Sequence, residues 1–312
     1  MPKNRKAEVR SLNNIAMARA VQAAVKPKFY GNKVLKSKVV THYPEHLERE
    51  YMRVTNAYMA KLNKVLAEHL PVIRKAIDAE RESMRHDDNR DILTVIDSEL
   101  TRIAEGFEKI QVSSFLETKL LNMSVLARNH KIREWKRIVR QTLGINIMDD
   151  YYKGEFFRHS LQIWADTNVQ LISSIPNAIL TYVSDIVKDG YISGKTNTAI
   201  GKAIQEKYGI ERRHAQFIAR DQMAKLNAEI TQAQQKDAGI EEYVWSTSDD
   251  IRVRERHKEL DGTRQKWSEP PVVDKRTGRR EHPGQDYNCR CVALPVFNLT
   301  ALNLPWEGKD EK

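Results

Sequence analysis

The chain has 312 residues, of which 40% are hydrophobic and 30% charged, and its formal net charge is +10 at neutral pH. No apolar run approaches the roughly 20 residues that a membrane-spanning helix needs, and the only two cysteines, Cys289 and Cys291, cannot build a disulfide framework. We therefore expect no membrane span, no signal peptide and folding in a reducing cytoplasm.

Positive charge is concentrated in two segments. Residues 1–42 contain ten Lys and Arg but one acid, Glu8, and a second cluster at 128–140 is opposed by Glu134. A basic arm on a nearly neutral body is typical of sequence-independent binding to double-stranded DNA, although a solvated tail has the same composition. The candidate DNA-binding residues are Lys3, Arg5, Lys6, Arg10, Lys26, Lys28, Lys33, Lys36, Lys38, Arg128, Lys131, Arg133, Lys136 and Arg137.

Long helices are predicted from about residue 46 to residue 190. Apolar residues step by three or four along 47–65, 92–120 and 157–187, which is the period of an amphipathic helix. Glycine and proline are rare before Gly144, where a basic helix should end, and Pro71 should kink or split the first helix. Residues 9–25 have some helical potential within an otherwise flexible arm. These stripes indicate helices packed on helices in an elongated body.

The pattern changes after Gly190. Thr196 can cap a short helix that ends at Gly209, and a second helix should end near Gly239. Alternating residues around 243–247 predict a strand, a charged helix follows at 249–260 with Asp249 as its cap, and a last short strand lies around 292–297. The expected fold is mainly α, with a small α+β C-terminal domain. The expected parts are a basic flexible arm (1–42), a helical body (43–190), a C-terminal domain (191–298) and a tail (299–312).

A dense series of motif residues runs from Trp245 to Pro295. In order, it reads W-x-T-x-x-D-x-R-V-R-x-x-H-x-x-L-D-G, then P-P, H-P-G, N-C-R-C and P. Over roughly residues 196–296 this order resembles the C-terminal domain of phage Mu F-like head-morphogenesis proteins. The resemblance implies a minor capsid protein, assembled in the host cytoplasm and located inside the virion near the portal vertex. Its implied partners are the portal protein, capsid or scaffolding proteins and packaged DNA, and its implied role is to assist DNA packaging or ejection without being an enzyme.

Two departures from that family pattern concern the metal-ligating residue types. Many relatives have a Cys-x-x-Cys pair just before Leu-Asp-Gly, where this chain has Arg254 and His257. The segment from Gly284 to Tyr287 also separates His-Pro from Asn-Cys-Arg-Cys, which are contiguous in some relatives. Both differences weaken an inference of a metal site that rests on the family.

A zinc hypothesis nevertheless follows from the residue types. His257, His282, Cys289 and Cys291 offer two imidazoles and two thiols, which would close a tetrahedral structural site and staple a small, loop-rich domain. In the alternative interpretation, the cysteines are small buried hydrophobic residues and the histidines form hydrogen bonds, so that the protein needs no cofactor.

The other motif residues are predicted to be structural. Trp245 should pack in the core, and charged hydrogen bonds, including an Arg252–Asp261 pair, should fix the loops. This structural set comprises Trp245, Asp250, Arg252, Asp261, Gly262, Asn288 and Arg290.

The alternative function is a metal-dependent hydrolase, a nuclease or a toxin-like effector carried in the virion. It would use Asp249, Asp250, His257 and Asp261. No Gly-rich phosphate-binding loop is present, which argues against a packaging motor.

Overall fold

The computed structural model describes residues 15–39, 41–83, 92–148 and 155–306. The chain divides into two compact units, each built from separate stretches of sequence. The bundle unit comprises Glu48–Met123 and Ile163–Arg220. The sheet unit comprises Met1–Leu47, Ser124–Gln162 and Asp221–Lys312.

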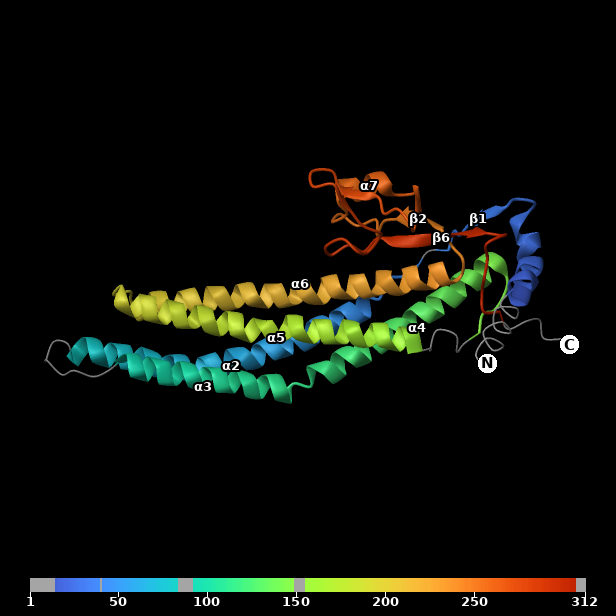
Figure 1. Ribbon diagram of the computed structural model, residues 1–312. Coiled ribbons are helices and arrows are strands. Elements are labelled where there is room, and N and C mark those ends of the chain that lie inside the picture. Colours follow the sequence, from blue (N-terminus) through green and yellow to red (C-terminus); the bar gives the residue numbers. More distant parts are fainter. Residues whose placement is uncertain (1–14, 40, 84–91, 149–154, 307–312) are drawn as a thin grey trace, which may run out of the picture. The chain divides into compact units, whose positions relative to one another are not determined.

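The bundle unit is built from long helices (Figure 1). It contains α3 (Ile92–Ser113), most of α2 (Glu45–Ser83) and α5 (Glu155–Ile192), and the first parts of α4 (Leu116–Leu143) and α6 (Asn197–Asp237). Residues spaced by three or four along these helices form one apolar core, as the sequence periodicity predicts. Representative core residues are Leu62, Leu66, Ile73, Ile96, Ile103, Phe107, Ile172, Ile179 and Ile204.

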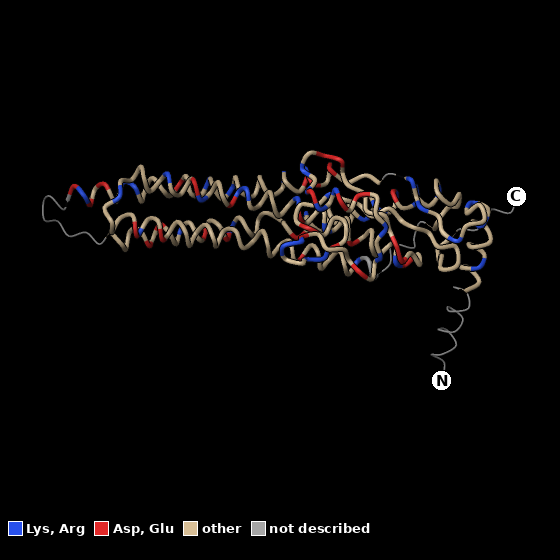
Figure 2. Tube along the Cα trace, turned by 90° about the horizontal axis from the view of Figure 1, so that it is seen from above, with Lys and Arg blue, Asp and Glu red and all other residues tan. Residues whose placement is uncertain are grey.

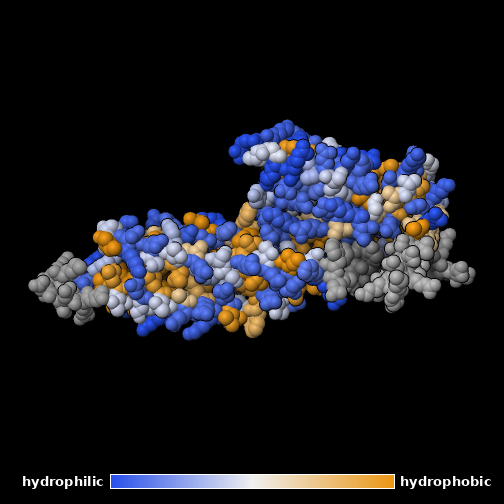
Figure 3. Space-filling model, in the orientation of Figure 1, coloured by the Kyte–Doolittle hydropathy of each residue, from blue (hydrophilic) through white to orange (hydrophobic). Residues whose placement is uncertain are grey.

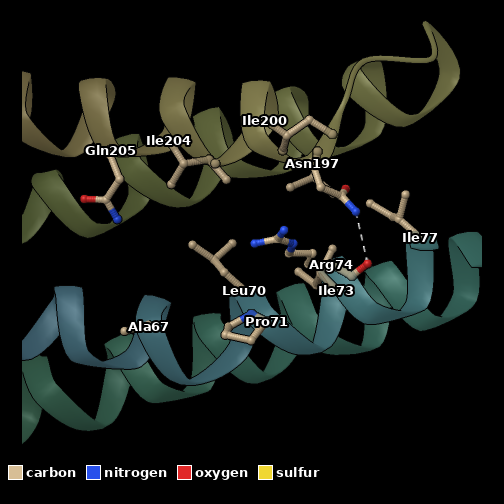
Figure 4. A pocket seen from close by; sticks show the side chains of 12 residues that line it. Ala67, Leu70, Pro71, Ile73, Arg74, Ile77, Asn197, Ile200, Ile204 and Gln205 are labelled. Atoms are coloured by element: carbon tan, nitrogen blue, oxygen red, sulfur yellow. Dashed lines mark hydrogen bonds between the residues drawn. The ribbon is translucent and has the colours of Figure 1, made fainter. Parts of the chain in front are cut away.

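Pro71 does not split α2, which continues as one helix through it to Ser83. A proline inside a helix lacks the N–H that would bond the carbonyl four residues earlier, here that of Ala67. Ala67 and Pro71 both line a groove of about 260 Å³, into which Ile200 and Ile204 of α6 also point (Figure 4). At one end of the groove, Asn197 Nδ2 donates to the Arg74 carbonyl at 3.3 Å. Apolar packing across α2 and α6 thus offsets the lost backbone bond.

Both ends of α6 match the predictions, but the break expected at Gly209 is absent. Thr196 Oγ1 accepts a hydrogen bond from Ala199 N at 3.2 Å, so Thr196 caps the helix. The expectation that this helix stops at Gly209 is wrong, because α6 continues without a break to Asp237. A helical glycine costs about 1 kcal/mol relative to alanine. Burial of Ile204, Ala215 and Ile218 on either side outweighs that cost.

The sheet unit contains a four-stranded antiparallel sheet in the order β1-β6-β2-β3. These strands are Val34–Lys36, Val292–Asn298, Glu242–Ser246 and Arg264–Lys266. A hairpin of β4 (Val272–Asp274) and β5 (Arg279–Arg280) and the short helix α7 (Glu255–Leu260) complete the C-terminal part. The strands expected around 243–247 and 292–297 are thus confirmed, and so is the mainly α fold with a small α+β part.

Most of the segment predicted as a flexible arm is folded. Residues 15–25 are helical, η1 (Lys26–Phe29) follows, and β1 pairs with β6 in the register Val34↔Asn298. The expectation of a flexible arm is therefore wrong for this stretch, because Val21, Val25 and Phe29 are buried against α4 in a shared core. In the expected tail, Leu302 and Leu304 are buried in the same core. Lys3, Arg5, Lys6 and Arg10 lie outside the described residues.

The surface differs in character between segments. Figure 3 shows apolar patches among polar residues over the helices of the bundle unit and a mainly hydrophilic surface around α7. The exposed apolar side chains of the bundle unit include Val112, Phe115, Ile192 and Ile210. Among the described residues, no helix combines the length and apolarity required to cross a bilayer.

Candidate functional site

The C-terminal part of the sheet unit brings the motif residues together. Trp245 is fully buried in β2, opposite Ala293 of β6, and contacts His257 of α7 with ring centroids 5.3 Å apart. Cys289 and Cys291 precede β6 and belong to the same apolar cluster as Trp245. The prediction that Trp245 packs in the core is confirmed.

Three ligand-type side chains converge inside this cluster. Cys289 Sγ and Cys291 Sγ each lie 3.6 Å from His257 Nδ1. The three atoms lie within 4.8 Å of one another, and all three residues are buried. Among the described residues, this is the one group of three or more Cys, His, Asp or Glu with that spacing.

The second ring nitrogen of His257, Nε2, contacts a buried carboxylate. His257 Nε2 lies 3.1 Å from Asp286 Oδ2, and Asp286 in turn pairs with Arg254 at 3.3 Å and with Arg279. Burial opposes ionisation of Asp286, but its hydrogen bonds from His257 and Tyr287 and the two arginines outweigh burial and lower its pKa to about 2. Asp286 is therefore ionised and orients the ring so that Nδ1 faces the sulfur atoms.

The charged forms of His257, Asp286 and Cys289 stabilise one another. Burial disfavours the protonated form of His257, but Asp286 and Cys289 outweigh it and raise the His257 pKa to about 9. Hydrogen bonds from Cys291 and His257 lower the pKa of Cys289 well below its usual value. Cys289 therefore carries thiolate character in this site.

His282 does not join the three converging residues. Its Nδ1 lies 2.9 Å from the Tyr243 hydroxyl, and the Trp267 ring packs edge-on at 4.7 Å between centroids. Burial among these rings lowers the pKa of His282 to about 4, so the ring is neutral and accepts the Tyr243 proton. The four-ligand set expected from the sequence is therefore wrong for His282.

The remaining motif residues fix the loops, with partners that differ from those expected. Asp250 accepts from the Arg252 backbone at 2.8 Å and from its guanidinium at 3.0 Å, and Arg290 approaches it at 3.8 Å. Asp261 instead accepts from Thr247 N at 2.8 Å, so the expected Arg252–Asp261 pair is wrong.

Backbone conformation explains three further motif positions. Asp249 does not cap α7, whose N-cap is Arg254, because Asp249 lies five residues upstream with φ 58°. Gly262 has φ 71° in the turn whose amide bonds the Trp245 carbonyl at 2.8 Å. Asn288, with φ 50°, donates its amide to Asp221 of α6 at 3.0 Å. These bonds connect the motif loops to α6 and β2.

The carboxylates of the hydrolase hypothesis do not gather around His257. Asp250 and Asp261 are occupied by the loop contacts above, and within the described chain no carboxylate joins His257 in a metal-ligand group. Sequence reasoning missed Asp286, the one carboxylate that contacts His257. Its position between His282 and Cys289 in a turn-rich loop was the only available signal.

The folded N-terminal segment and α4 present the predicted basic residues in one unit. Lys26, Lys28, Lys33, Lys36 and Lys38 are exposed, and residues 15–39 contain no Asp or Glu. Figure 2 shows the Lys and Arg positions along this stretch in blue.

The basic residues of α4 differ in how far they are exposed on this surface. Arg133 is exposed, while Arg128, Lys136 and Arg137 are half-buried. Burial and the nearby charge of Arg158 both lower the pKa of Arg128, so two cations lie close together there. Arg137 is held by Glu134 at 2.9 Å. Lys131 is only 3% exposed, which contradicts its expected role in DNA contact.

Burial of Lys131 predicts an unusual pH dependence of stability. Desolvation outweighs the attraction of Glu134 and, with the charge of Arg137, lowers the Lys131 pKa from 10.5 to about 8. Between these values the unfolded chain binds one more proton than the folded chain, so this residue makes stability rise with pH, by about 1 kcal/mol per pH unit. Urea unfolding at pH 7.5–10.5 should show this rise relative to Lys131→Met, which lacks the titrating group. Lys36→Met, at an exposed lysine, should retain the wild-type profile, and parallel profiles for wild type and Lys131→Met would contradict the prediction.

Comparison with known proteins identifies the region that contains this site. The family model described as Phage Mu protein F like protein matches residues 181–294. This segment is similar to phage Mu protein F. It runs from the end of α5 through α6 to β6 and includes all three converging ligands. The resemblance expected from the motif order is thereby confirmed for this segment.

One curated relative aligns beyond the Mu F-like region. An uncharacterized protein of Haemophilus influenzae is 31% identical over 246 residues, which cover 77% of this chain. The chain spans about half the length of this relative, 53%. No solved structure matches the chain.

Proposed function

We propose that this protein is a minor head protein of a tailed phage that binds the portal and contacts packaged double-stranded DNA. The observation that carries the proposal is the match of residues 181–294 to the Mu F-like family. On this proposal the protein acts inside the virion, near the portal vertex, where it assists DNA packaging or ejection. Capsid or scaffolding proteins are its other proposed partners.

The cationic surface of the sheet unit supports DNA contact. Five exposed lysines of residues 26–38 and the exposed Arg133 have no acidic residue among 15–39 to compensate them. Lysine and arginine side chains that neutralise phosphates release counterions, which makes binding independent of sequence and sensitive to salt. Because residues 15–39 are folded, the backbone that carries these lysines loses little conformational entropy on binding.

A salt series tests the DNA contact. Replacing Lys26, Lys28, Lys33, Lys36 and Lys38 together with alanine should weaken binding to an arbitrary duplex. The slope of log K against log salt should fall by about 0.9 for each lysine that contacts a phosphate. The matched control replaces five exposed lysines of the bundle unit, Lys61, Lys75, Lys109, Lys195 and Lys202. Equal slopes for the two variants in a filter-binding assay would remove this surface from the proposal.

Portal binding needs a separate test. Purified protein and the purified portal oligomer of the same phage should migrate together on a sucrose gradient at a salt concentration that abolishes DNA binding. The five-lysine variant should still co-migrate, because its changes are confined to the surface proposed for DNA. The absence of the protein from purified mature particles would overturn the assignment to the virion.

A further inference from the structure

We propose that His257 Nδ1, Cys289 Sγ and Cys291 Sγ together bind one zinc ion. The inference goes beyond the proposed function, because it concerns what stabilises the Mu F-like region and does not depend on portal or DNA binding. Two thiols and an imidazole are the ligand types that zinc prefers in proteins.

The distances between the ligand atoms match a tetrahedral zinc ion. Zinc lies about 2.3 Å from thiolate sulfur and about 2.0–2.1 Å from imidazole nitrogen. At tetrahedral angles these bond lengths separate sulfur from nitrogen by about 3.6 Å. Both sulfur atoms lie 3.6 Å from the same nitrogen, His257 Nδ1. The chain therefore holds His257 Nδ1 at the distance from each sulfur atom that the ion requires.

The surroundings of His257 orient it as a ligand. In the zinc-bound form, the proton on Nε2 is donated to Asp286 at 3.1 Å, and the ion replaces the proton on Nδ1, which faces the sulfur atoms. Such a carboxylate partner on the far nitrogen is the usual second contact of a zinc-bound histidine. Arg254 and Arg279 neutralise and fix Asp286, so the carboxylate keeps its position.

Trp245 supplies a second observation at the sulfur side. Its Nε1 is buried and has no hydrogen-bond partner among the described residues. A buried N–H without an acceptor costs about 1–3 kcal/mol. A zinc-bound Cys291 thiolate retains lone pairs and would accept from this N–H.

The same residues fit a catalytic thiol poorly. A Cys–His–Asp arrangement with one nucleophilic sulfur needs that sulfur to be accessible to substrate. Cys289 and Cys291 are only 3% and 5% exposed, and both are equally distant from the histidine. Two buried sulfur atoms at the same distance from one nitrogen are the arrangement of a metal site.

Metal content of the full-length protein tests the site. Protein purified in the presence of reductant should contain about one zinc per chain by mass spectrometry. Cys289→Ser, Cys291→Ser and His257→Gln should each lose most of it. His282→Gln is the matched control and should keep its zinc, because His282 bonds Tyr243 and is not one of the three converging residues. Zinc loss from His282→Gln as complete as from His257→Gln would overturn the proposed ligand set.

Two measurements on the wild-type protein keep the proposal testable if the variants fail to fold. Cobalt substitution should give a near-ultraviolet thiolate-to-cobalt band and visible bands of a tetrahedral ion. Cys289 and Cys291 should react with a thiol reagent only after a chelator removes the zinc. Protein that stays metal-free after incubation with zinc, or a Cys289–Cys291 disulfide found after alkylation in cell extracts, would overturn the proposal. Neither result affects the portal and DNA tests.

Discussion

Phe297→Ala is expected to lower the free energy of unfolding by about 3–5 kcal/mol, because it empties the centre of the sheet-unit core. Phe297 is fully buried in β6 and stacks on Trp135 of α4 with ring centroids 6.1 Å apart. Its strand position pairs with Leu35 of β1. The variant should therefore also expose residues 15–39 to proteolysis, measured by limited trypsin digestion beside urea unfolding.

Phe115→Ala is the matched control, because it makes the same chemical change at a side chain that is 68% exposed. Its effect on unfolding should stay within about 0.5 kcal/mol. A comparable loss for the two variants, or unchanged trypsin cleavage of residues 15–39 in Phe297→Ala, would show that the N-terminal segment does not depend on this core.

Gly239→Ala is expected to cost about 2–5 kcal/mol, the sum of backbone strain and overpacking. Gly239 follows α6 with φ +74°, a conformation that only glycine adopts without cost. An added Cβ would lie 2.0 Å from the carbonyl oxygen of Ala301, so the backbone itself would have to move. Thermal unfolding followed by circular dichroism should show a large drop in Tm.

Gly278→Ala separates the two causes. Gly278 has φ +71°, but nothing lies within 4 Å of its added Cβ. Its cost should be the backbone strain alone, about 1–2 kcal/mol. If the two alanine variants lost the same stability, close packing of residues 301–303 against the end of α6 would not be part of the folded state.

The helices were predictable because burial follows a local period. Residues such as Leu62, Leu66, Ile96 and Ile103 have the spacing that places them on one face, and each is buried. The helix end predicted at Gly209 was wrong. A glycine indicates a helix end only when packing does not compensate the free-energy cost of glycine in a helix. That compensation comes from residues that are distant in sequence and cannot be seen locally.

In the N-terminal segment, charge was a poor guide to structure. Its lysines suggested a solvated arm, yet Val21, Val25 and Phe29 follow one another at intervals of four and are all buried. That spacing was a usable signal for a packed helix end. The pairing of β1 with β6 had no comparable signal, because it joins residues at least 260 positions apart.

In the candidate site, residue types were predictable and partners were not. His257, Cys289 and Cys291 were recognised as ligand types, and the structure brings them together. His282 has equally suitable chemistry, but the turn that follows it places its ring against Tyr243 and Trp267. No sequence pattern distinguished Asp286, because single acidic residues are common in loops.

The pairing of Val34 with Asn298 also sets the order of events during translation. At about 5–20 residues per second, a ribosome needs roughly 10–50 s to synthesise the residues between these two strands. During that time β1 has already emerged, and its partner edge does not yet exist. The sheet therefore closes only after nearly the whole described chain has been released, and until then the nascent chain exposes an unpaired strand edge beside Val21, Val25 and Phe29.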